Sequence, residues 1–504
     1  MNYTDIPHEK LKQIKTLSEL KSAGYTPKTI KQELRDNLIA KLKSKEPVFE
    51  GIHGYEDTVI PEIQRAILSM HDINLLGLRG QAKTRLARMM IELLDEYVPV
   101  IEGSELNDDP LKPLSRFGRD VVKEKGDHTP VVWMHRSERY TEKLATPDVS
   151  VADLVGDVDP IKAASLHLPY SDERVIHYGL IPRSNRCIFV INELPDLQAR
   201  IQVALFNILQ EGDIQIRGFK LRLPLDIQFV FTANPEDYTN RGSIVTPLKD
   251  RIDSQIITHY PKNLEIGKKI TQQEAHVKTE QQGLVESNEI AKDMIEQIAL
   301  EARSSEYIDE KSGVSARLTI SAYENLISSA ERRALINGES KTSIRVSDFW
   351  GVIPSITGKV ELVYEGEQEG AGIVAQNLIG KAIRNQFIQY FPDPEKEKKK
   401  KSESIYKSMF DWFGDGGTVD ILNDASNSEY KKALTEIPGL KEMIKKKFSD
   451  KTEDEKLFLM EFALHGLAEY SMLSKKFLIS KTSFSDLLSS MFSMPSDFED
   501  DDED

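Results

Sequence analysis

The sequence lacks the features that would allow a disulfide, a zinc site built from cysteines, or a membrane span. Cys187 is the single cysteine among 504 residues, so no internal disulfide can form. No stretch approaches the roughly 18 consecutive apolar residues that a membrane helix needs. The N-terminus is charged and polar and has no apolar centre like that of a secretory signal. Together these absences predict a cytoplasmic protein with no membrane segment.

Positive charge is scarce relative to negative charge. The net charge is −16, because 66 Lys and Arg stand against 82 Asp and Glu. Since an acidic chain repels nucleic-acid phosphates, we expect no general binding to DNA or RNA. The last residues, 497–504, are almost entirely Asp and Glu. We interpret them as a solvated acidic tail, and a docking tail for a basic partner is the alternative.

The rest of the composition is typical of a globular protein, with 39 % hydrophobic and 29 % charged residues. The length predicts about three domains. Residues 1–50 have helical spacing of apolar positions and predict an N-terminal helical segment of two short helices, separated near Gly24. Cys187 precedes the apolar run IFVI, which indicates a buried side chain rather than a catalytic thiol.

Residues 51–262 alternate short apolar runs with helical patterns, which predicts an α/β domain. Runs that are apolar at nearly every position are typical of parallel strands covered by helices on both faces. The four runs are INLLGL (73–78), PVVWMH (130–135), CIFVINE (187–193) and IQFVFTANP (227–235). A parallel sheet built from these strands is the predicted core of the domain.

The remaining sequence changes character. Residues 263–392 contain amphipathic helical patterns and predict a helical lid domain. Residues 393–404 form a polar run with a block of lysines, which we interpret as a linker. Residues 405–504 predict a helical C-terminal domain that ends in the acidic tail. The predicted fold class is therefore an α/β core with a parallel sheet, followed by a helical lid and a helical C-terminal domain.

A phosphate-binding loop follows the first apolar run. The segment GLRGQAKT lies between a predicted strand and a predicted helix, where the P-loop pattern G-x-x-x-x-G-K-[ST] is expected. Glycines let backbone N–H groups turn toward phosphate oxygens, and the start of the helix adds partial positive charge. The predicted nucleotide-binding residues are Gly77, Leu78, Arg79, Gly80, Gln81, Ala82, Lys83 and Thr84. The fold class is thus that of a P-loop NTPase.

Three positions of this loop carry specific expectations. Lys83 would neutralise the β- and γ-phosphates of ATP, and Thr84 would offer its hydroxyl to Mg²⁺. Ala82 stands where the pattern has its second glycine, which weakens the bare motif. An added methyl group still permits the loop, so we retain ATP and Mg²⁺ as the predicted cofactors.

The third apolar run ends in a candidate hydrolysis site. Glu193 would orient and polarise the water that attacks ATP, and the residue before it would hold the shell of the metal ion. That residue is usually Asp, but here it is Asn192. An amide still accepts a hydrogen bond from metal-bound water but carries no charge. We therefore predict slow but real hydrolysis, with Thr84 and Asn192 as the metal-facing residues.

Three further residues complete the predicted catalytic set. Asn234 ends the fourth apolar run, where an amide would help to position the water. Arg251 follows in TPLKDRID, and an arginine that reaches across a subunit boundary would stabilise the charge of the transition state. Arg317 begins a predicted helix of the lid domain, from which it would close onto the nucleotide.

These pieces, in this order, resemble the AAA+ superfamily, and more closely the MoxR and magnesium-chelatase I-subunit group. The resemblance covers roughly residues 45–350. MoxR-type loops have the form G-x-P-G-x-A-K-T, so Ala82 is a feature of the group, whereas Arg79 replaces the usual proline. LKDRID resembles the arginine-finger motif of the group with Ile252 in place of Phe, and SARL resembles its second sensor.

The resemblance implies properties that residue patterns alone do not. Members of the group form ATP-dependent hexameric rings, and they commonly work with a protein that carries a von Willebrand factor A domain. They act as chaperone-like remodelling machines or as motors that insert metal ions into cofactors. We therefore expect a ring of identical subunits and a partner of this kind.

Three other functions can be compared with the sequence. Asn192 favours a nucleotide-gated scaffold that binds ATP, assembles and barely hydrolyses it. A true magnesium chelatase subunit, which inserts Mg²⁺ into protoporphyrin, would need a large porphyrin-binding partner. A transcriptional activator of the sigma-54 type would need a basic DNA-recognition helix, and the acidic C-terminal segment offers none.

Overall fold

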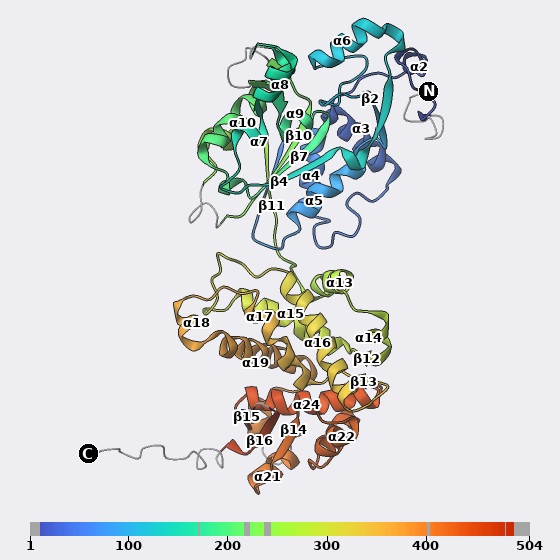
Figure 1. Cartoon of the computed structure of the whole chain (residues 1–504). Coiled ribbons are helices and arrows are strands. Elements are labelled where there is room, and N and C mark those ends of the chain that lie inside the picture. Colours follow the sequence, from blue (N-terminus) through green and yellow to red (C-terminus); the bar gives the residue numbers. More distant parts are fainter. Residues whose placement is uncertain are drawn as a thin grey trace, which may run out of the picture. The chain divides into compact units, whose positions relative to one another are not determined.

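The structure is a computed structural model, and it divides the chain into two compact units, Met1–Tyr260 and Pro261–Asp504 (Figure 1). The described residues are 11–169, 172–215, 222–235, 243–400, 404–478 and 480–487. The acidic tail predicted for residues 497–504 lies outside this range. Each unit is described separately below.

A five-stranded, all-parallel sheet forms the centre of the first unit, in the order β11-β1-β10-β7-β4. The strands are β1 (Ile73–Leu76), β4 (Tyr140–Leu144), β7 (Cys187–Asn192), β10 (Ile227–Ala233) and β11 (Ser254–Ile257). Because all strands run the same way, their carboxyl ends meet at one edge of the sheet. That edge is where open α/β sheets bind their ligands.

The central strands are apolar on both faces because each face supports a separate hydrophobic core. Side chains alternate along a strand, so Val190 packs with α4 and α5 while Phe189 packs with α10 on the opposite side. Figure 1 shows α4 and α5 on one side of the sheet and α7 and α10 on the other. Cys187 is buried in this sheet, as predicted, and burial raises the pKa of its thiol to about 11.

The helices of the first unit include the two predicted near the N-terminus. The α-helices described in this unit are α2 (Leu17–Ser22), α3 (Ile30–Ser44), α4 (Val59–Leu68), α5 (Lys83–Met89), α6 (Arg116–Lys125), α7 (Val151–Leu154), α8 (Pro160–Leu166), α9 (Leu180–Arg183), α10 (Ala199–Glu211) and α12 (Thr246–Lys249). A buried ion pair of 2.6 Å between Arg139 and Glu33 fixes α3 to the sheet domain. The backbone N–H of Ile30 also donates to Asp226 at 2.9 Å. The N-terminal helices are therefore part of the first unit.

Three of the four predicted core strands are confirmed as β1, β7 and β10, and the fourth prediction is wrong. The run at 130–135 forms β3 (Val131–His135), which pairs antiparallel with β2 (Tyr97–Ile101) outside the five-stranded sheet. Only Val131 of β3 is buried, so this strand is not covered on both faces. The sequence did not predict β4 or β11, which take the two outer positions of the sheet.

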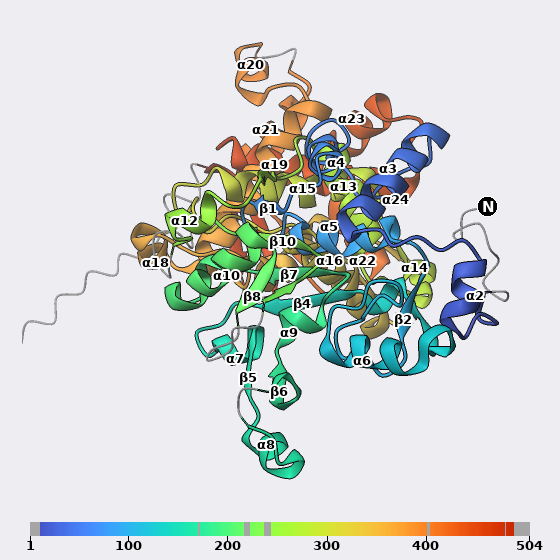
Figure 2. The ribbon, with the colours of Figure 1, turned by 90° about the horizontal axis from the view of Figure 1, so that it is seen from above.

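Two short antiparallel ribbons extend from the first unit. Strands β5 (Gly156–Val158) and β6 (Ile176–Tyr178) pair with each other, and α8 lies between them in sequence. Figure 2 shows α8 reaching away from the sheet beyond this ribbon. Strands β8 (Asp213–Gln215) and β9 (Arg222–Pro224) form the second ribbon.

The second unit is mainly helical. Its helices are α13 (Leu264–Glu274), α14 (Thr279–Leu284), α15 (Glu289–Arg303), α16 (Arg317–Ile336), α17 (Ile353–Thr357), α18 (Tyr364–Glu369), α19 (Ala371–Tyr390), α20 (Pro394–Lys399), α21 (Lys407–Gly414), α22 (Asn427–Thr435), α23 (Leu440–Lys447) and α24 (Glu453–Glu469). Helix α20 lies within the segment predicted as a linker. The lid helices and the C-terminal helices share one hydrophobic core, in which Phe387 of α19 packs with Phe462 of α24.

The second unit also contains strands that the sequence did not predict. Strands β14 (Val419–Leu422), β15 (Ser474–Leu478) and β16 (Lys481–Ser485) form an antiparallel sheet in the order β14-β16-β15. The two-residue strands β12 (Val285–Glu286) and β13 (Thr342–Ser343) pair in parallel. Phe484 of β16 is fully buried in the shared core, which holds the small sheet against the helices.

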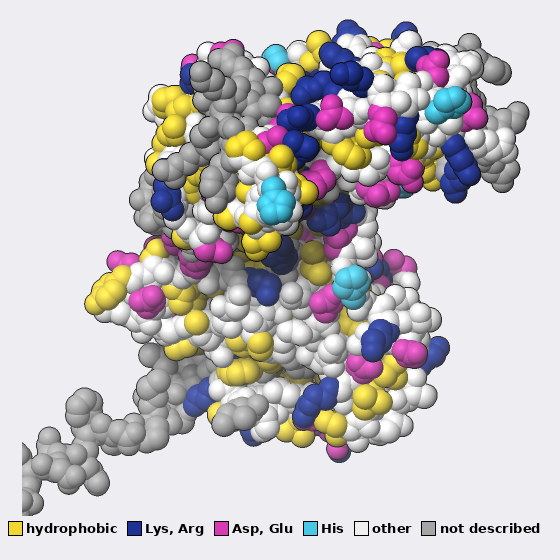
Figure 3. Space-filling view, turned by 45° about the horizontal axis from the view of Figure 1, so that its top comes forward, with side chains coloured by type: hydrophobic (Ala, Val, Ile, Leu, Met, Phe, Trp, Pro, Cys, Tyr) yellow, Lys and Arg dark blue, Asp and Glu magenta, His cyan; other side chains and the backbone are white. Residues whose placement is uncertain are grey.

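Charged side chains of both signs cover the surface. Figure 3 shows one face of the molecule, on which Asp and Glu lie among Lys and Arg. On α6, Arg116 is 3.3 Å from Asp172 and Arg119 is 3.6 Å from Glu173. In the described part of the chain, no helix has the length and apolar character of a membrane span.

Candidate functional site

The predicted phosphate loop lies at the carboxyl edge of the central sheet. Strand β1 ends at Leu76, α5 begins at Lys83, and the loop connects them. The N–H of Gly77 donates to the carbonyl of Ala233 at 3.1 Å, so the loop starts directly beside the end of β10. The predicted order of strand, loop and helix is thus present.

Close packing and backbone conformation explain the residue types in the loop. A Cβ atom at Gly77 would lie 2.0 Å from Thr258 Oγ1 and 2.3 Å from Gln81 Oε1, so only glycine fits there. Gly80 has a φ of 71°, which favours glycine. Ala82 has a φ of 56°, in the same left-handed region. This explains why the general pattern has glycine at that position, and the alanine is tolerated at an energetic cost.

Hydrogen bonds hold the loop in shape. The ammonium of Lys83 donates to the carbonyls of Gly77 and Leu78, so the loop wraps around it. Tyr260 donates to the carbonyl of Arg79 at 3.0 Å, and Thr258 donates to Gln81 at 2.6 Å. Tyr55 donates to the carbonyl of Gln81 at 3.0 Å. Side chains of the first unit therefore anchor the loop.

Asn192 is the last residue of β7, and it is 7 % exposed. Thr84 Oγ1 donates to Asn192 Oδ1 at 3.3 Å, and Thr232 Oγ1 donates to the same oxygen at 3.0 Å. The two predicted metal-facing residues, Thr84 and Asn192, are therefore in direct contact. On its other side Asn192 Nδ2 donates to Glu142 Oε1 at 2.7 Å.

Glu193 follows directly on the end of β7 in a strained conformation. Its φ is 56° and its ψ is 50°, which is unusual for a residue other than glycine. The Glu193 N–H donates to Thr232 Oγ1 at 3.1 Å, and the side chain is exposed. Strain of this kind is concentrated at functional sites. The conformation leaves the carboxylate of Glu193 exposed at the same edge as Thr84.

The other three predicted catalytic residues lie in three different places. Asn234 directly follows β10 and is 5 % exposed, next to the hydrogen bond that joins Gly77 to Ala233. Arg251 donates to Gln210 Oε1 at 2.7 Å, so within this chain it is held on α10. Arg317 is the exposed first residue of α16 in the second unit.

Sequence analysis did not identify Glu142 as a site residue. It lies on β4, whose sequence YTEKL has three consecutive polar residues and belongs to no nucleotide-binding motif. In the sheet register Leu144 is opposite Asn192, so Glu142 is two residues before the carboxyl end of its strand. A carboxylate in a short polar strand is common, and its contact with Asn192 emerges only from the pairing of β4 with β7.

The residues at this edge fit a magnesium ion held together with nucleotide phosphates. Mg²⁺ prefers oxygen ligands, and it is usually bound by one or two protein groups, substrate phosphates and waters. Thr84 supplies a hydroxyl oxygen and Asn192 an amide oxygen, and the Glu142 carboxylate beside Asn192 adds negative charge. In the described residues, no group of three or more His, Cys, Asp or Glu side chains is placed to hold a metal ion.

The parallel sheet, the loop built around Lys83 and the polar groups at the ends of β7 and β10 define a P-loop NTPase of the AAA+ class. No model of a known protein family matches the chain. Individual relatives do. The chain is 22% identical over 329 residues to magnesium-chelatase subunit ChlI-1 of Arabidopsis thaliana, covering 62% of this chain and 74% of the relative.

Two further proteins are similar. The chain is 24% identical over 338 residues to magnesium-chelatase subunit ChlI of Chlorella vulgaris, covering 62% of this chain and 89% of the relative. A solved complex of the BchI and BchD subunits of magnesium chelatase aligns with 19% identity and a TM-score of 0.33, over 64% of this chain and 98% of that chain. The sequence relatives carry the assignment. They support an AAA+ ATPase of the MoxR and magnesium-chelatase I-subunit group.

Proposed function

We propose that this protein binds and hydrolyses ATP in a ring of identical subunits. The observation that carries the proposal is the gathering of Lys83, Thr84, Asn192 and Glu193 at one edge of a parallel sheet. In the proposed function, hydrolysis drives either the remodelling of a partner protein or the insertion of a metal ion into a cofactor.

The residues at the sheet edge divide the chemical work. Lys83 and the backbone of residues 77–82 bind the phosphates, and the loop is already shaped for them by its anchors. When bound between Thr84 and the phosphates, Mg²⁺ would neutralise charge that develops on the phosphate oxygens. Glu193 orients the attacking water and accepts its proton, and Asn234 helps to position the same water. The rigid ends of β7 and β10 keep these two side chains in place.

Two arginines are proposed to act when subunits assemble and when the lid closes. Arg251 would reach the γ-phosphate of a neighbouring subunit, which requires it to leave Gln210 and the Phe206 ring 5.2 Å away. Both groups are on the surface helix α10, so this exchange needs no change in the core. Arg317 would close onto the nucleotide from its own chain. A hexamer is the proposed assembly.

The partner remains a proposal that rests on the family. A protein with a von Willebrand factor A domain is the proposed partner, and the C-terminal segment of residues 396–504 is the proposed docking region. That segment shares its core with the lid, with Phe413 and Phe462 fully buried. Deleting it would expose this core, so docking is better tested with surface changes such as Leu478→Ser on β15. The cytoplasmic location stays a prediction.

Two other functions are kept as candidates. The neutral amide of Asn192 favours a nucleotide-gated scaffold with little hydrolysis, because the metal-facing carboxylate of related ATPases is missing at this position. The names of the relatives favour a subunit of a magnesium chelatase. That activity would require a porphyrin-binding partner. Both candidates keep ATP binding at Lys83 and Thr84 and differ from the first proposal in what hydrolysis drives.

The test is steady-state ATP hydrolysis with Mg²⁺, measured across a range of protein concentrations. The wild type is compared with Lys83→Ala, Glu193→Gln and Arg251→Ala. Turnover per subunit should rise with concentration in the wild type because the finger arginine comes from a neighbour. Lys83→Ala should weaken ATP binding by about 10- to 100-fold, the worth of a charged hydrogen bond.

Each variant answers a separate question. Glu193→Gln should bind ATP normally but lose turnover by about 100-fold or more. Arg251→Ala should lose turnover, and mixing it with Glu193→Gln subunits should restore part of it, since each variant supplies the group that the other lacks. Turnover that is independent of concentration would refute a shared site. ATP binding without turnover in the wild type would favour the scaffold.

A further inference from the structure

The amide of Asn192 connects the hydroxyl of Thr84 to a carboxylate on the neighbouring strand. The oxygen Oδ1 accepts from Thr84 at 3.3 Å, and the nitrogen Nδ2 donates to Glu142 Oε1 at 2.7 Å. This orientation of the amide follows from chemistry, because a carboxylate accepts hydrogen bonds and must face the nitrogen. The amide therefore links the metal-facing hydroxyl of Thr84 to the carboxylate of Glu142 by one hydrogen bond on each side.

Glu142 is held at this position by two more donors. Its second oxygen, Oε2, accepts from Arg88 Nη2 at 2.9 Å and from Tyr140 at 3.0 Å. Burial, together with the Glu142 carboxylate, raises the pKa of Tyr140, so the hydroxyl keeps its proton and remains a donor. The side chain of Glu142 is 27 % exposed and that of Arg88 is 64 % exposed. The carboxylate is thus fixed in direction but still open to solvent.

We propose that Glu142 supplies, through Asn192, the negative charge that position 192 lacks, and that it thereby raises the affinity of the ATP site for Mg²⁺. This inference rests on the proposed ATP site. A carboxylate that accepts from an amide N–H₂ polarises the amide and makes its oxygen a stronger acceptor. Groups bonded to metal ligands orient these ligands and strengthen binding in the same way.

A simpler role for Glu142 is to hold Arg88 and Tyr140 at the outer strand of the sheet. In that role its loss would change stability and leave metal binding alone. In the proposed role its loss would change the dependence of ATP binding on Mg²⁺ and leave metal-free ATP binding alone. The two roles therefore predict different measurements.

The experiment measures the affinity for ATP in the presence of Mg²⁺ and in the presence of EDTA. All variants carry Glu193→Gln so that ATP persists during the measurement. The ratio of the two affinities reports the metal. We expect Glu142→Gln, which keeps the size of the side chain but removes its charge, to lower this ratio about 10-fold. Mn²⁺ binding to the ADP complex, followed by electron paramagnetic resonance, should weaken by the same factor.

Two comparisons sharpen the result. Glu92→Gln is the matched control, because Glu92 pairs with Arg136 at 2.6 Å on the surface of the same unit and has no contact with Asn192. It should leave the ratio unchanged. Asn192→Asp combined with Glu142→Gln moves the charge to position 192 and should restore the ratio. Recovery of this kind would not follow from a structural role of Glu142.

A variant of opposite sign keeps the proposal testable if Glu142→Gln fails to fold. Arg88→Met removes the exposed guanidinium that partly neutralises the carboxylate, so the ratio should rise. An unchanged ratio in both Glu142→Gln and Arg88→Met would overturn the inference. If Lys83→Ala binds ATP as tightly as the wild type, the ATP site itself is wrong. If Lys83→Ala loses ATP while Glu142→Gln keeps the full Mg²⁺ effect, only the role of Glu142 is wrong.

Discussion

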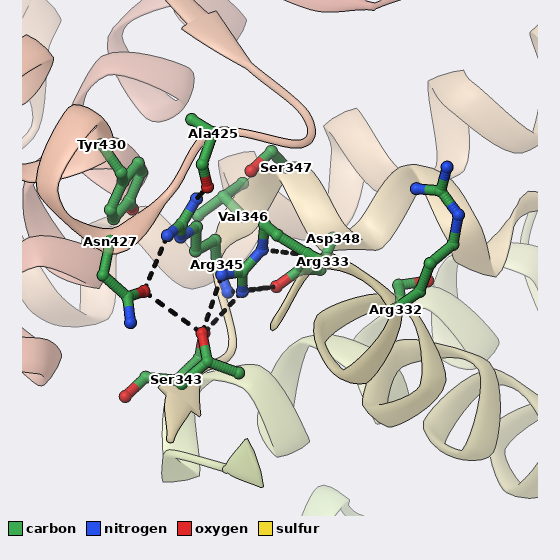
Figure 4. A network of polar contacts seen from close by, with 12 residues as sticks. Arg332, Arg333, Ser343, Arg345, Val346, Ser347, Asp348, Ala425, Asn427 and Tyr430 are labelled. Atoms are coloured by element: carbon green, nitrogen blue, oxygen red, sulfur yellow. Dashed lines mark hydrogen bonds and ion pairs between the residues drawn. The ribbon is translucent and has the colours of Figure 1, made fainter. Parts of the chain in front are cut away.

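Two networks of polar side chains, one in each unit, differ in how they end. The network at the sheet edge of the first unit runs from Thr84 through Asn192 to Glu142 and ends in groups that face solvent. The network of the second unit is closed around the almost fully buried guanidinium groups of Arg333 and Arg345. Figure 4 shows it around Arg333 and Arg345. The comparison separates a network that is available for chemistry from one that holds the fold together.

The closed network joins the lid helices to the C-terminal helices. Arg333 is 1 % exposed and lies 3.0 Å from Asp348. Arg345 donates to the carbonyl of Ala425 at 2.7 Å and to Asn427 at 2.8 Å (Figure 4). Since each guanidinium reaches groups on another segment, the network fixes how these segments pack.

A buried carboxylate completes this network. Glu461 on α24 accepts from the backbone N–H of Val346 at 2.7 Å and of Ser347 at 3.0 Å, and from Tyr430 at 2.7 Å. Although burial opposes ionisation, the neighbouring His465 and these donors keep the pKa of Glu461 below its usual value. A buried carboxylate that already accepts several hydrogen bonds is poorly suited to bind a ligand. At the sheet edge, by contrast, Glu193 is exposed.

The largest effect is expected from opening the closed network with Arg333→Ala. Removing one partner of a buried ion pair leaves Asp348 buried and unpaired, which should lower the free energy of unfolding by about 3–5 kcal/mol. Arg332→Ala is the control on the adjacent residue. Arg332 pairs with Asp424 at 2.6 Å, but both side chains are exposed, so its loss should cost at most about 1 kcal/mol. Chemical denaturation checks both values.

The comparison fails if these two variants behave alike. Equal, small losses would mean that the buried network contributes no more than a surface pair. A loss of ATP binding in Arg333→Ala at temperatures where the second unit stays folded would mean that this network also serves the nucleotide site.

The next largest effect concerns Glu296, a buried carboxylate of α15 outside the closed network. Burial raises its pKa to about 7, although Thr271 donates to it and Arg303 lies nearby. The folded state therefore binds the proton more tightly than the unfolded state, in which the pKa of this carboxyl is near its ordinary value of 4.5. Its contribution to stability is full below about pH 4.5 and is lost as pH rises through 7.

Glu296→Gln removes this pH dependence. The difference between the stability of the variant and that of the wild type should grow in favour of the variant between about pH 4.5 and 8, by up to about 3 kcal/mol. Denaturation at several pH values checks this. A difference that stays constant with pH would show that hydrogen bonds in the fold offset the burial of the Glu296 carboxylate, as they do for Glu461.

Asn192→Asp tests the open network. The change places a second carboxylate where Asn192 now donates to Glu142 at 2.7 Å. Without metal, this repulsion should lower the stability of the first unit by on the order of 2 kcal/mol. Adding Glu142→Gln should remove the loss, and Mg²⁺ with ATP should reduce it in the single variant. A single variant as stable as the wild type without metal would contradict the observed contact.

Ala82→Gly should have the smallest effect. Glycine relieves the left-handed backbone at φ 56° but loses a half-buried methyl group and gains freedom in the unfolded chain. These opposing terms should keep the change in stability within about 1 kcal/mol. ATP binding should be retained. A clear loss of ATP affinity in calorimetry would mean that the methyl group of Ala82 shapes the loop.

Much of the sheet edge was predictable because its residues belong to long apolar runs or to a motif. The runs around Ile188 and Val230 predict buried strands, and the polar residues that follow them mark the strand ends. The motif from Gly77 to Thr84 places the phosphate loop. These signals are local in the sequence, so a single sequence is enough to identify them.

The remaining features depend on pairing between distant segments. Strand β4 is an outer strand with partly exposed residues, so its sequence carries no apolar run, and Glu142 was missed with it. Strand β3 has the apolar run but pairs antiparallel with β2. The network around Arg345 joins residues about 80 positions apart. Such contacts are set by tertiary packing, which local patterns do not encode.

Single-turnover hydrolysis shows whether the edge formed by β1, β7 and β10 is an ATP hydrolysis site. Limiting ATP and Mg²⁺ are mixed with excess protein, and bound ATP and product are followed together. We expect the wild type to convert bound ATP, and Glu193→Gln to bind it equally well but to convert it at least about 100-fold more slowly. Conversion at the wild-type rate in Glu193→Gln would show that Glu193 does not activate the attacking water.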